Sequence, residues 1–167
     1  MAVTRTLYLI RHAIAAERGA TWPDDARRPL THQGMARMRQ VVKGLEELGV
    51  TIDLVLTSPL ARAVETAEIV SRGLKTKPEI IAVPALAPGG APVRVAEALA
   101  PHTSPRTVAI VGHEPELGEL AGWLIGSRTP LVFKKGGVAC IEVSEWPPAR
   151  KGQLLWLATP RMLRSLR

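Results

Sequence analysis

The residues best suited to chemistry in this sequence are arginines and histidines that follow short apolar runs. Arg11 and His12 follow one run, Ser58 and Arg62 follow a second, and His113 follows a third. Arginine presents a planar fork of donors to phosphate oxygens, and the imidazole nitrogens of histidine act as nucleophiles or donors near neutral pH. Brought together, these side chains would bind a phosphoryl group and transfer it.

Each of these features also has a purely structural interpretation. His12 could hydrogen-bond a loop carbonyl, Arg11 and Arg62 could be surface charges, and Gly112-His113 could be a plain turn between a strand and a helix. Taken singly, each feature favours the structural interpretation. Ligands bind outside the carboxyl ends of parallel strands, however, and the coincidence of three such strand ends favours a functional site.

Other chemistries find less support in the sequence. His12 and His113 lack a third ligand at metal spacing, and the neighbouring arginines would repel a cation, so we expect no metal and no cofactor. Glu114, directly before a proline, could be a ligand but equally fits a helix cap. The phosphate-loop, dinucleotide-binding and nucleophile-elbow patterns are absent. Cys140, the single cysteine, lies in an apolar run, as is typical of a buried thiol.

The intervening segments predict the elements that must position these residues. Strand candidates are short and continuously apolar, as expected of parallel strands covered on both faces; they span 7–10, 54–57, 79–83, 107–111, 138–143 and 153–157. Helix candidates span 33–48, with Thr31 as its cap, 60–72, 93–100, 115–125 and a short segment after Pro160. The alternation predicts an α/β fold: a three-layer sandwich with a mainly parallel sheet of about six strands, one antiparallel edge and helices on both faces.

The composition fits one globular domain spanning residues 1–167. The chain has 167 residues, an apolar fraction of 46% and a formal net charge of +7, which favours anionic partners. Nucleic acid is disfavoured because only one Phe and one Tyr are available for base stacking. No apolar run approaches a membrane span, and no signal peptide precedes the first strand. We therefore expect a cytoplasmic monomer with no membrane partner.

Three segments resemble the signature motifs of the histidine phosphatase (phosphoglycerate-mutase-like) superfamily. Residues 9–12, Leu-Ile-Arg-His, resemble its Arg-His-Gly motif. Residues 58–67 resemble its pattern Ser-Pro-x-x-Arg-Ala-x-x-Thr-Ala, and Val-Gly-His at 111–113 resembles its third motif. The small size and the segments 28–34 and 158–163 are similar to the SixA-type phosphohistidine phosphatases of this superfamily.

The resemblance implies a role for each matching residue. His12 would be the nucleophile that forms a phosphohistidine intermediate, which water then hydrolyses. Arg11, Arg62 and His113 would bind the transferred phosphoryl oxygens and stabilise the charge of the transition state. The cationic pocket would take the place usually held by magnesium, so the reaction would need no metal.

Two further residues are candidates for substrate binding. Ser58 would add a hydrogen bond to the phosphoryl group, although a role as helix cap fits its position equally well. Arg28 would lie near the entrance and sense the charge of the substrate, although a surface arginine in a loop fits equally well.

Two departures from the family pattern bear on the reaction. The glycine of the first motif is replaced by Ala13, so the backbone there cannot use angles reserved for glycine. Relatives acting on phosphate esters carry a glutamate general acid soon after the third strand, whereas residues 83–90 contain no carboxylate. An alkoxide leaving group needs a proton, and an imidazole needs less help. The missing acid therefore favours phosphohistidine as substrate, with Glu17 and Glu97 as fallback acids that fit surface positions better.

The substrate and even the turnover leave alternatives open. The stretch 74–107 is too short for a large cap insertion, and an open site suits a phosphorylated protein side chain. A phosphatase for a small anionic phosphoester metabolite is the first alternative. A phosphate-binding module that kept the pocket and lost turnover is the second.

Overall fold

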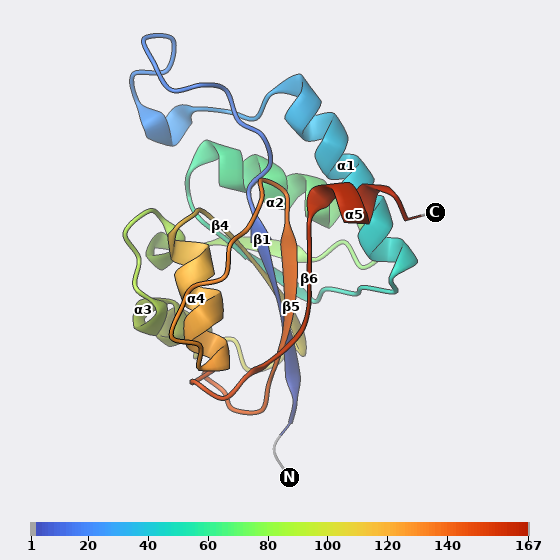
Figure 1. Cartoon of the computed structure of the whole chain (residues 1–167), viewed down its shortest axis with the longest axis vertical. Helices are drawn as coiled ribbons and strands as arrows, with labels where there is room; N and C mark the ends of the chain where they lie inside the picture. The colour runs from blue at the N-terminus through green and yellow to red at the C-terminus, as the bar shows by residue number, and fades with distance from the viewer. Residues whose placement is uncertain (1–2, 167) are drawn as a thin grey trace.

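The computed structural model describes residues 3–166, and within them six strands form one sheet (Figure 1). The order across the sheet is β3-β2-β4-β1-β5-β6. The strands are β1 (Arg5–Arg11), β2 (Leu54–Thr57), β3 (Glu79–Ala82), β4 (Thr107–Gly112), β5 (Val138–Val143) and β6 (Gln153–Ala158). The strands from β3 to β1 are parallel, whereas β5 is antiparallel to both β1 and β6. The predicted α/β class with an antiparallel edge is confirmed.

Helices cover both faces of the sheet, which confirms the predicted three layers. One face carries α1 (His32–Glu47), α2 (Ala61–Gly73) and α5 (Pro160–Arg164), and the other carries α3 (Pro92–Leu99) and α4 (Glu116–Ile125). Figure 1 shows α5 beside α1, and α4 in front of the sheet with α3 at its side. Two short 3-10 turns, η1 (Asp25–Arg27) and η2 (Pro84–Leu86), interrupt the connecting segments. No helix within residues 3–166 is long and apolar enough to cross a membrane.

The central position of β1 follows from its apolar residues. Leu7 and Leu9 pack into the core beneath α3 and α4, whereas Ile10 packs beneath α1 and α2. All three side chains are fully buried, and each such burial contributes about 1.5–3 kcal/mol. A shift of one residue in register would exchange the two faces, so this burial fixes the register of β1. It thereby fixes where the residues after Ile10 lie.

The boundary of β1 differs from the sequence prediction in one respect that concerns the site. The strand extends to Arg11, which pairs with Gly112 of β4 and donates its backbone N–H to the carbonyl of Gly137 at 3.1 Å. Arg11 is therefore the last residue of the sheet and not the first residue of a loop. The apolar run alone predicts a strand that ends at residue 10. Backbone pairing of Arg11 with the neighbouring strand β4 and with Gly137 extends the strand by one residue.

The first helix begins as its sequence predicts. The Thr31 hydroxyl oxygen accepts a hydrogen bond from the backbone N–H of Gly34 at 2.9 Å, which satisfies one free donor of the first turn. Further along α1, Gly44 faces the last turns of the chain. A Cβ atom at Gly44 would lie 2.0 Å from the carbonyl oxygen of Leu163 in α5. The absence of a side chain there is what lets α5 pack against α1.

We predict that Gly44→Ala destabilises the protein although it improves helix propensity. Alanine favours a helix interior by about 1 kcal/mol over glycine, but the new methyl group must displace α5. The expected net loss is about 1–3 kcal/mol in the free energy of urea unfolding. The exposed neighbour substitution Lys43→Ala is the control and should change that free energy by less than about 0.5 kcal/mol. A Gly44→Ala protein as stable as its parent would contradict the described packing of α5.

Candidate active site

The sheet brings the three predicted strand ends to one edge. His12 donates its backbone N–H to the carbonyl of Gly112 at 3.0 Å, and Ser58 donates its own to the carbonyl of Val111 at 3.0 Å. The His12 and His113 rings lie with their centroids 5.2 Å apart. The side chains of His12, Arg62 and His113 are all buried. The juxtaposition that the sequence predicted is therefore present in the fold.

The His12 ring is held in a tautomer that suits a nucleophile. Its Nδ1 lies 2.7 Å from the carbonyl oxygen of Ala13, which can only accept, so we assign the ring proton to Nδ1. Nε2 then carries a free lone pair. Burial, followed by the charges of His113, Arg62 and Arg11, lowers the pKa of His12 to about 3, against the opposing effect of the Ala13 carbonyl. The ring is thus neutral at physiological pH.

The His113 ring is oriented by the residue that follows β2. Its Nε2 lies 2.7 Å from the Ser58 hydroxyl oxygen, which also accepts from the backbone N–H of Leu60 at 3.2 Å. We assign the ring proton to Nδ1, because His113 Nε2 is the only acceptor in reach of the Ser58 hydroxyl within the described residues and the hydroxyl therefore donates to it. Burial and then the charge of Arg62 lower the pKa of His113 to about 4. Ser58 is fully buried and serves both the ring and the turn before α2; its predicted contact with substrate stays a prediction.

Both arginines of the motifs are fixed by protein carbonyls on one side of the guanidinium. Arg11 donates from Nη1 to the carbonyl of Phe133 at 2.8 Å, and Arg62 donates from Nη1 to the carbonyl of Asp25 at 3.0 Å. Burial lowers the pKa of both guanidinium groups, partly offset by Glu114 near Arg11 and by Asp25 near Arg62. Each remains charged at neutral pH.

Three buried polar nitrogens at this edge have no hydrogen-bond partner within residues 3–166. They are Arg11 Nε, Arg62 Nε and His113 Nδ1, one from each of the three motifs. Buried donors without a partner are costly and therefore rare in folded proteins. These three nitrogens come from three motifs that meet at one edge of the sheet, and they leave hydrogen-bonding capacity there that the described residues do not use.

Asp25 is a residue of this site that sequence reasoning missed. Its carboxylate accepts from Arg62 Nη2 at 3.1 Å and from Arg28 Nε at 3.0 Å. Burial alone would raise the pKa of Asp25, but the hydrogen bond from Arg28 and the charges of Arg62 and Arg28 outweigh it and hold that pKa low. The only signal in the sequence was an acidic pair next to an arginine pair, which is equally typical of a solvated turn.

Arg28 is neither an exposed loop arginine nor shown to contact substrate. Its side chain is buried and donates from Nη1 to the carbonyl of Ala16 at 2.6 Å, so it is not a surface arginine. Asp25 connects it to Arg62, and its charge contributes to the lowered pKa of His113. Arg28 thus borders the site, and its contact with substrate remains a prediction.

The alanine that replaces the motif glycine fits its place without strain. Ala13 is buried in the core, and its backbone N–H donates to the Thr66 hydroxyl at 3.0 Å. Thr66 in turn donates to the carbonyl of Arg62 at 2.7 Å, which ties the first motif to the second. Within residues 3–166 the only non-glycine residue with positive φ is Lys77. Ala13 therefore adopts ordinary backbone angles, and its methyl group is accommodated.

Two glutamates follow His113 and contact backbone groups nearby. Glu114 caps α4, because its Oε1 accepts from the backbone N–H of Gly118 at 2.7 Å, and burial raises its pKa. Glu116 accepts from the backbone N–H of Gly89 at 2.8 Å and thereby holds the loop after η2. No group of three or more His, Cys, Asp or Glu residues within 3–166 is arranged to hold a metal ion.

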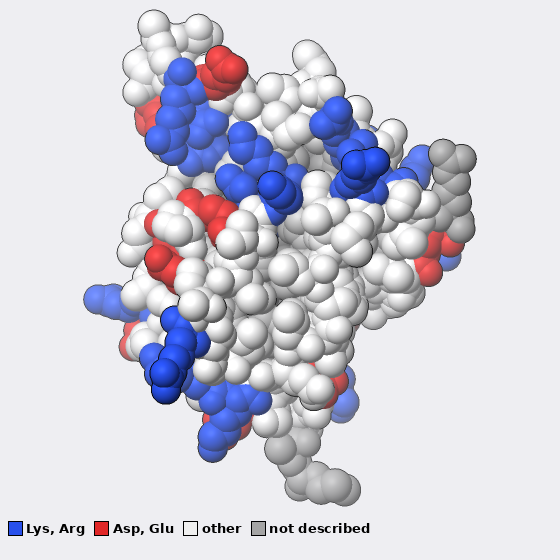
Figure 2. All heavy atoms as spheres, viewed as in Figure 1, with Lys and Arg blue, Asp and Glu red and all other residues white. Residues whose placement is uncertain are grey.

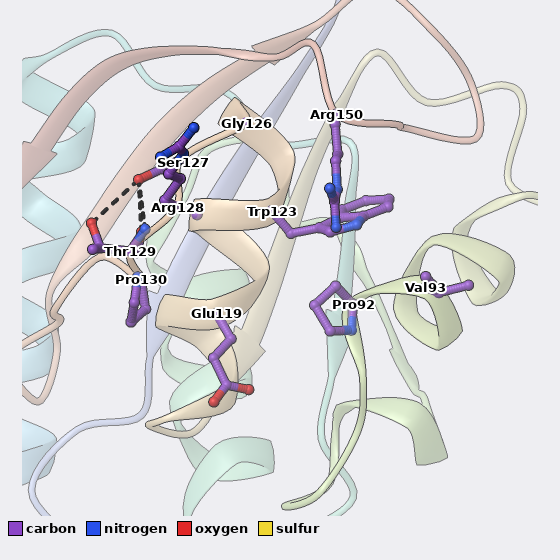
Figure 3. A pocket seen from close by; sticks show the side chains of 11 residues that line it. Pro92, Val93, Glu119, Trp123, Gly126, Ser127, Arg128, Thr129, Pro130 and Arg150 are labelled. Carbon is purple, nitrogen blue, oxygen red and sulfur yellow. Dashed lines mark hydrogen bonds between the residues drawn. The ribbon is translucent and has the colours of Figure 1, made fainter.

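Away from the strand-end cluster, a cavity of about 770 Å³ lies between α3, α4 and the loop after α4 (Figure 3). Trp123, Arg150 and Glu119 line it, as Figure 3 shows. The hydroxyl oxygens of Ser127 and Thr129 at its rim lie 3.4 Å from one another, and no histidine borders them. Because no histidine lies beside these hydroxyls to activate them, the strand-end cluster and not this cavity is the candidate active site.

Comparison with known proteins agrees with the fold and with the resemblance seen in the sequence. A sequence profile described as the histidine phosphatase superfamily (branch 1) matches residues 7–87, which include Arg11, His12 and Arg62. The phosphohistidine phosphatase SixA of Escherichia coli is 30% identical over 156 residues, which are 92% of this chain and 93% of that protein. The chain belongs to the histidine phosphatase superfamily.

Within that superfamily the chain is similar to SixA. A solved structure of the protein histidine phosphatase SixA complexed with tungstate superposes with a TM-score of 0.83 at 29% identity, covering 93% of this chain and 97% of that one. An uncharacterised Picosynechococcus protein is 38% identical over 140 residues, 79% of this chain and 81% of its own length. The α-ribazole phosphatase of Shigella flexneri, at 20% identity and a TM-score of 0.70 over 93% of this chain and 96% of that one, shares the fold alone. The predicted resemblance is confirmed.

The lowered histidine pKa values predict that stability falls in mild acid. His113 has a pKa of about 4 in the folded protein, against about 6.5 when unfolded, so the unfolded state binds more protons between these values. Stability is full above about pH 6.5 and is lost as the pH falls towards 4. His113→Asn should reduce the difference in unfolding free energy between pH 7 and pH 5 by about 2 kcal/mol.

Urea unfolding at the two pH values measures this effect. The exposed substitution His32→Asn is the control and should leave the pH difference as in the parent. Added tungstate should restore stability at pH 5 in the parent, because an oxyanion favours protonated rings. An unchanged pH difference in His113→Asn would refute the assignment of a buried, neutral ring.

Proposed function

We propose that the protein is a metal-independent phosphatase that acts through a phosphohistidine intermediate on His12. The single observation that carries this proposal is the set of three buried donors without partners, one from each motif, at the sheet edge where His12 lies. A phosphoryl group bound to Arg11, Arg62 and His113 would satisfy the donors and face the nucleophile. Fixed cationic groups stabilise the charge of a phosphoryl transition state without a metal.

The chemistry would proceed in two displacements at phosphorus. His12 Nε2 donates its lone pair to phosphorus, a P–N bond forms, and the bond to the leaving group breaks with its electron pair. A water molecule then attacks the phosphorus of the intermediate, loses a proton to solvent and releases inorganic phosphate. Nε2 recovers its lone pair. The Ala13 carbonyl accepts a hydrogen bond from Nδ1–H throughout, which stabilises the positive charge that the ring acquires when phosphorylated.

We further propose that the substrate is phosphohistidine in a protein. Similarity to SixA, whose name is phosphohistidine phosphatase, supports this choice over 92% of the chain. The absence of a carboxylate from residues 83–90 supports it chemically, because an imidazole protonated on its other nitrogen leaves without a general acid. In this proposal the neutral rings and the charged arginines bind the phosphoryl group, and none of them protonates the leaving group.

A second candidate, a phosphatase for small phosphoesters, is favoured by one observation. The Oε2 atom of Glu116 is buried without a partner and borders the same small cavity as His113. Such a carboxyl group could donate the proton that an alkoxide leaving group needs. The fallback acids considered from sequence, Glu17 and Glu97, are both exposed.

Substitution of the nucleophile tests the first proposal. We predict that His12→Ala abolishes phosphate release from a phosphohistidine peptide, a loss of at least about 10³-fold in kcat, because the other histidine of the site, His113, has its Nε2 occupied by Ser58. The parent, quenched with base during turnover, should carry acid-labile, base-stable phosphate on His12. Chelation with EDTA should leave its rate unchanged. His32→Ala is the control for the loss of a histidine, and circular dichroism checks that each variant is folded.

Each contrary result overturns a different part of the proposal. Retained turnover in His12→Ala excludes this nucleophile. A parent that binds tungstate but neither turns over nor becomes phosphorylated would be a phosphate-binding module. Loss of activity with EDTA would refute the metal-independent mechanism.

The isosteric substitution Glu116→Gln separates the two substrate classes. Glutamine keeps an oxygen for the N–H of Gly89 but cannot act as an acid. We predict that kcat/KM for phosphohistidine changes by less than about threefold, because that leaving group needs no acid from the enzyme. The parent should prefer phosphohistidine over phosphoserine by at least about 100-fold. A preference for phosphoserine that Glu116→Gln abolishes would instead establish the ester phosphatase.

A further inference from the structure

The loop before β5 is attached directly to the nucleophile and its arginine. The carbonyl of Phe133 accepts from Arg11 Nη1 at 2.8 Å, and the backbone N–H of Gly136 lies 3.1 Å from the carbonyl oxygens of both Arg11 and His12. Gly136 has a φ of 82°, an angle that favours glycine. These contacts come from the backbone on either side of residues 134–135. Residues 134 and 135 therefore lie next to the candidate active site, on its solvent side, which we call the mouth of the site.

Those two side chains are both lysines, and both are free. Lys134 and Lys135 are exposed, and neither makes an ion pair or a side-chain hydrogen bond within the part of the chain that the structure describes. Val132, just before them, is 74% exposed. Two unpaired cations and an exposed valine thus project from the loop that supports Arg11. Nothing in the fold of the protein itself accounts for them.

A second exposed segment beside the site is also basic. Arg18 and Arg27 lie in the segment between β1 and α1 that supplies Asp25 to Arg62, and both are exposed. Arg18 Nε approaches the Asp25 carboxylate only to 3.5 Å. Figure 2 shows lysine and arginine side chains gathered across the upper part of the molecule, where the segment between β1 and α1 lies in Figure 1. We call Arg18, Arg27, Lys134 and Lys135 the basic rim.

The basic rim is exposed, whereas the donors proposed for the phosphoryl group are buried. That group would be bound by buried donors of Arg11, Arg62 and His113. Exposed cations contribute little to the stability of a fold, and of these four only Arg18 makes an ion pair within the described residues. The other three gain energy when an acidic surface approaches, and charge complementarity then raises the rate of association.

We propose that the basic rim is a docking surface for an acidic patch around the phosphorylated side chain of a protein substrate. This inference rests on the proposed function and adds the kind of partner that the site takes. Carboxylates flanking the phosphohistidine would pair with Lys134 and Lys135 on one side and with Arg18 and Arg27 on the other. The docking contacts are separate from the chemistry, because they leave the buried donors untouched.

The test compares two synthetic phosphohistidine peptides, one flanked by glutamates and one by glutamines, with free phosphohistidine. The charge-reversed variant Lys134→Glu/Lys135→Glu should lose at least about tenfold in kcat/KM for the glutamate-flanked peptide. The same variant should keep its kcat/KM for free phosphohistidine within about twofold. In the parent, the preference for glutamate flanks should shrink as salt is raised.

A charge-matched control variant lies away from the site. Lys43→Glu/Lys75→Glu makes the same change in net charge at exposed positions, in the later part of α1 and before the amino end of β3. This control should behave like the parent with all three substrates. An equal loss in the control would assign the effect to overall charge, and an equal loss on free phosphohistidine would assign it to the phosphoryl pocket. Either result, or an unchanged rim variant, overturns the proposal.

Failure of the proposed function would give a different pattern. If the parent hydrolyses none of the three substrates, the proposed reaction is wrong while docking is still measurable by calorimetry with the unphosphorylated glutamate-flanked peptide. The rim variant should bind that peptide about tenfold more weakly than the parent does. Equal affinity of the two proteins would refute the docking surface independently of turnover.

Discussion

The backbone pairing of β1 with β4 and of β4 with β2 is the constraint on which the site depends. Hydrogen bonds from His12 to Gly112 and from Ser58 to Val111 carry the parallel ladder just past the ends of the strands. The first motif thereby meets the third, and the third meets the second, at distances set by the sheet and not by flexible loops. Apolar burial on both faces fixes the register of the ladder. The reactive residues are thus placed by the same energy that folds the core.

The site combines an excess of positive charge with hydrogen-bond donors that have no partner in the described residues. Arg11 and Arg62 are charged and held from one side, while Arg11 Nε, Arg62 Nε and His113 Nδ1 have no partner in the described chain. The fold tolerates this because both rings stay neutral, which spares it further buried charge. An incoming dianion would find a pre-arranged set of donors and would pay little to reorganise them. Asp25 limits the excess of charge without reaching the nucleophile.

The sequence predicted the elements and the three motifs, because short apolar runs and the residues after them are local patterns. It did not predict Asp25 or the Phe133 carbonyl, because neither lies at a strand end or has a distinctive local pattern. Ser58 and Arg28 were each left with two interpretations, since their partners are remote in sequence: Ser58 contacts His113 across 55 positions. The sequence placed Arg11 just after the strand, whereas the structure includes it in β1. Its pairing with Gly112 and Gly137 depends on neighbours in space that sequence order does not reveal.

The reversed direction of β5 has a consequence for how this protein can diverge. Because β5 runs against β1, the loop that reaches the site comes before its strand and carries none of the three motifs. That loop touches Arg11 and His12 through the backbone carbonyl of Phe133 and the backbone N–H of Gly136, so neither contact depends on the side chains at 134 and 135. The two side chains are therefore free to change without disturbing the nucleophile. If the basic rim selects the partner as proposed, partner choice and reaction chemistry would reside in separable parts of the chain, and relatives could share one reaction while serving different partners.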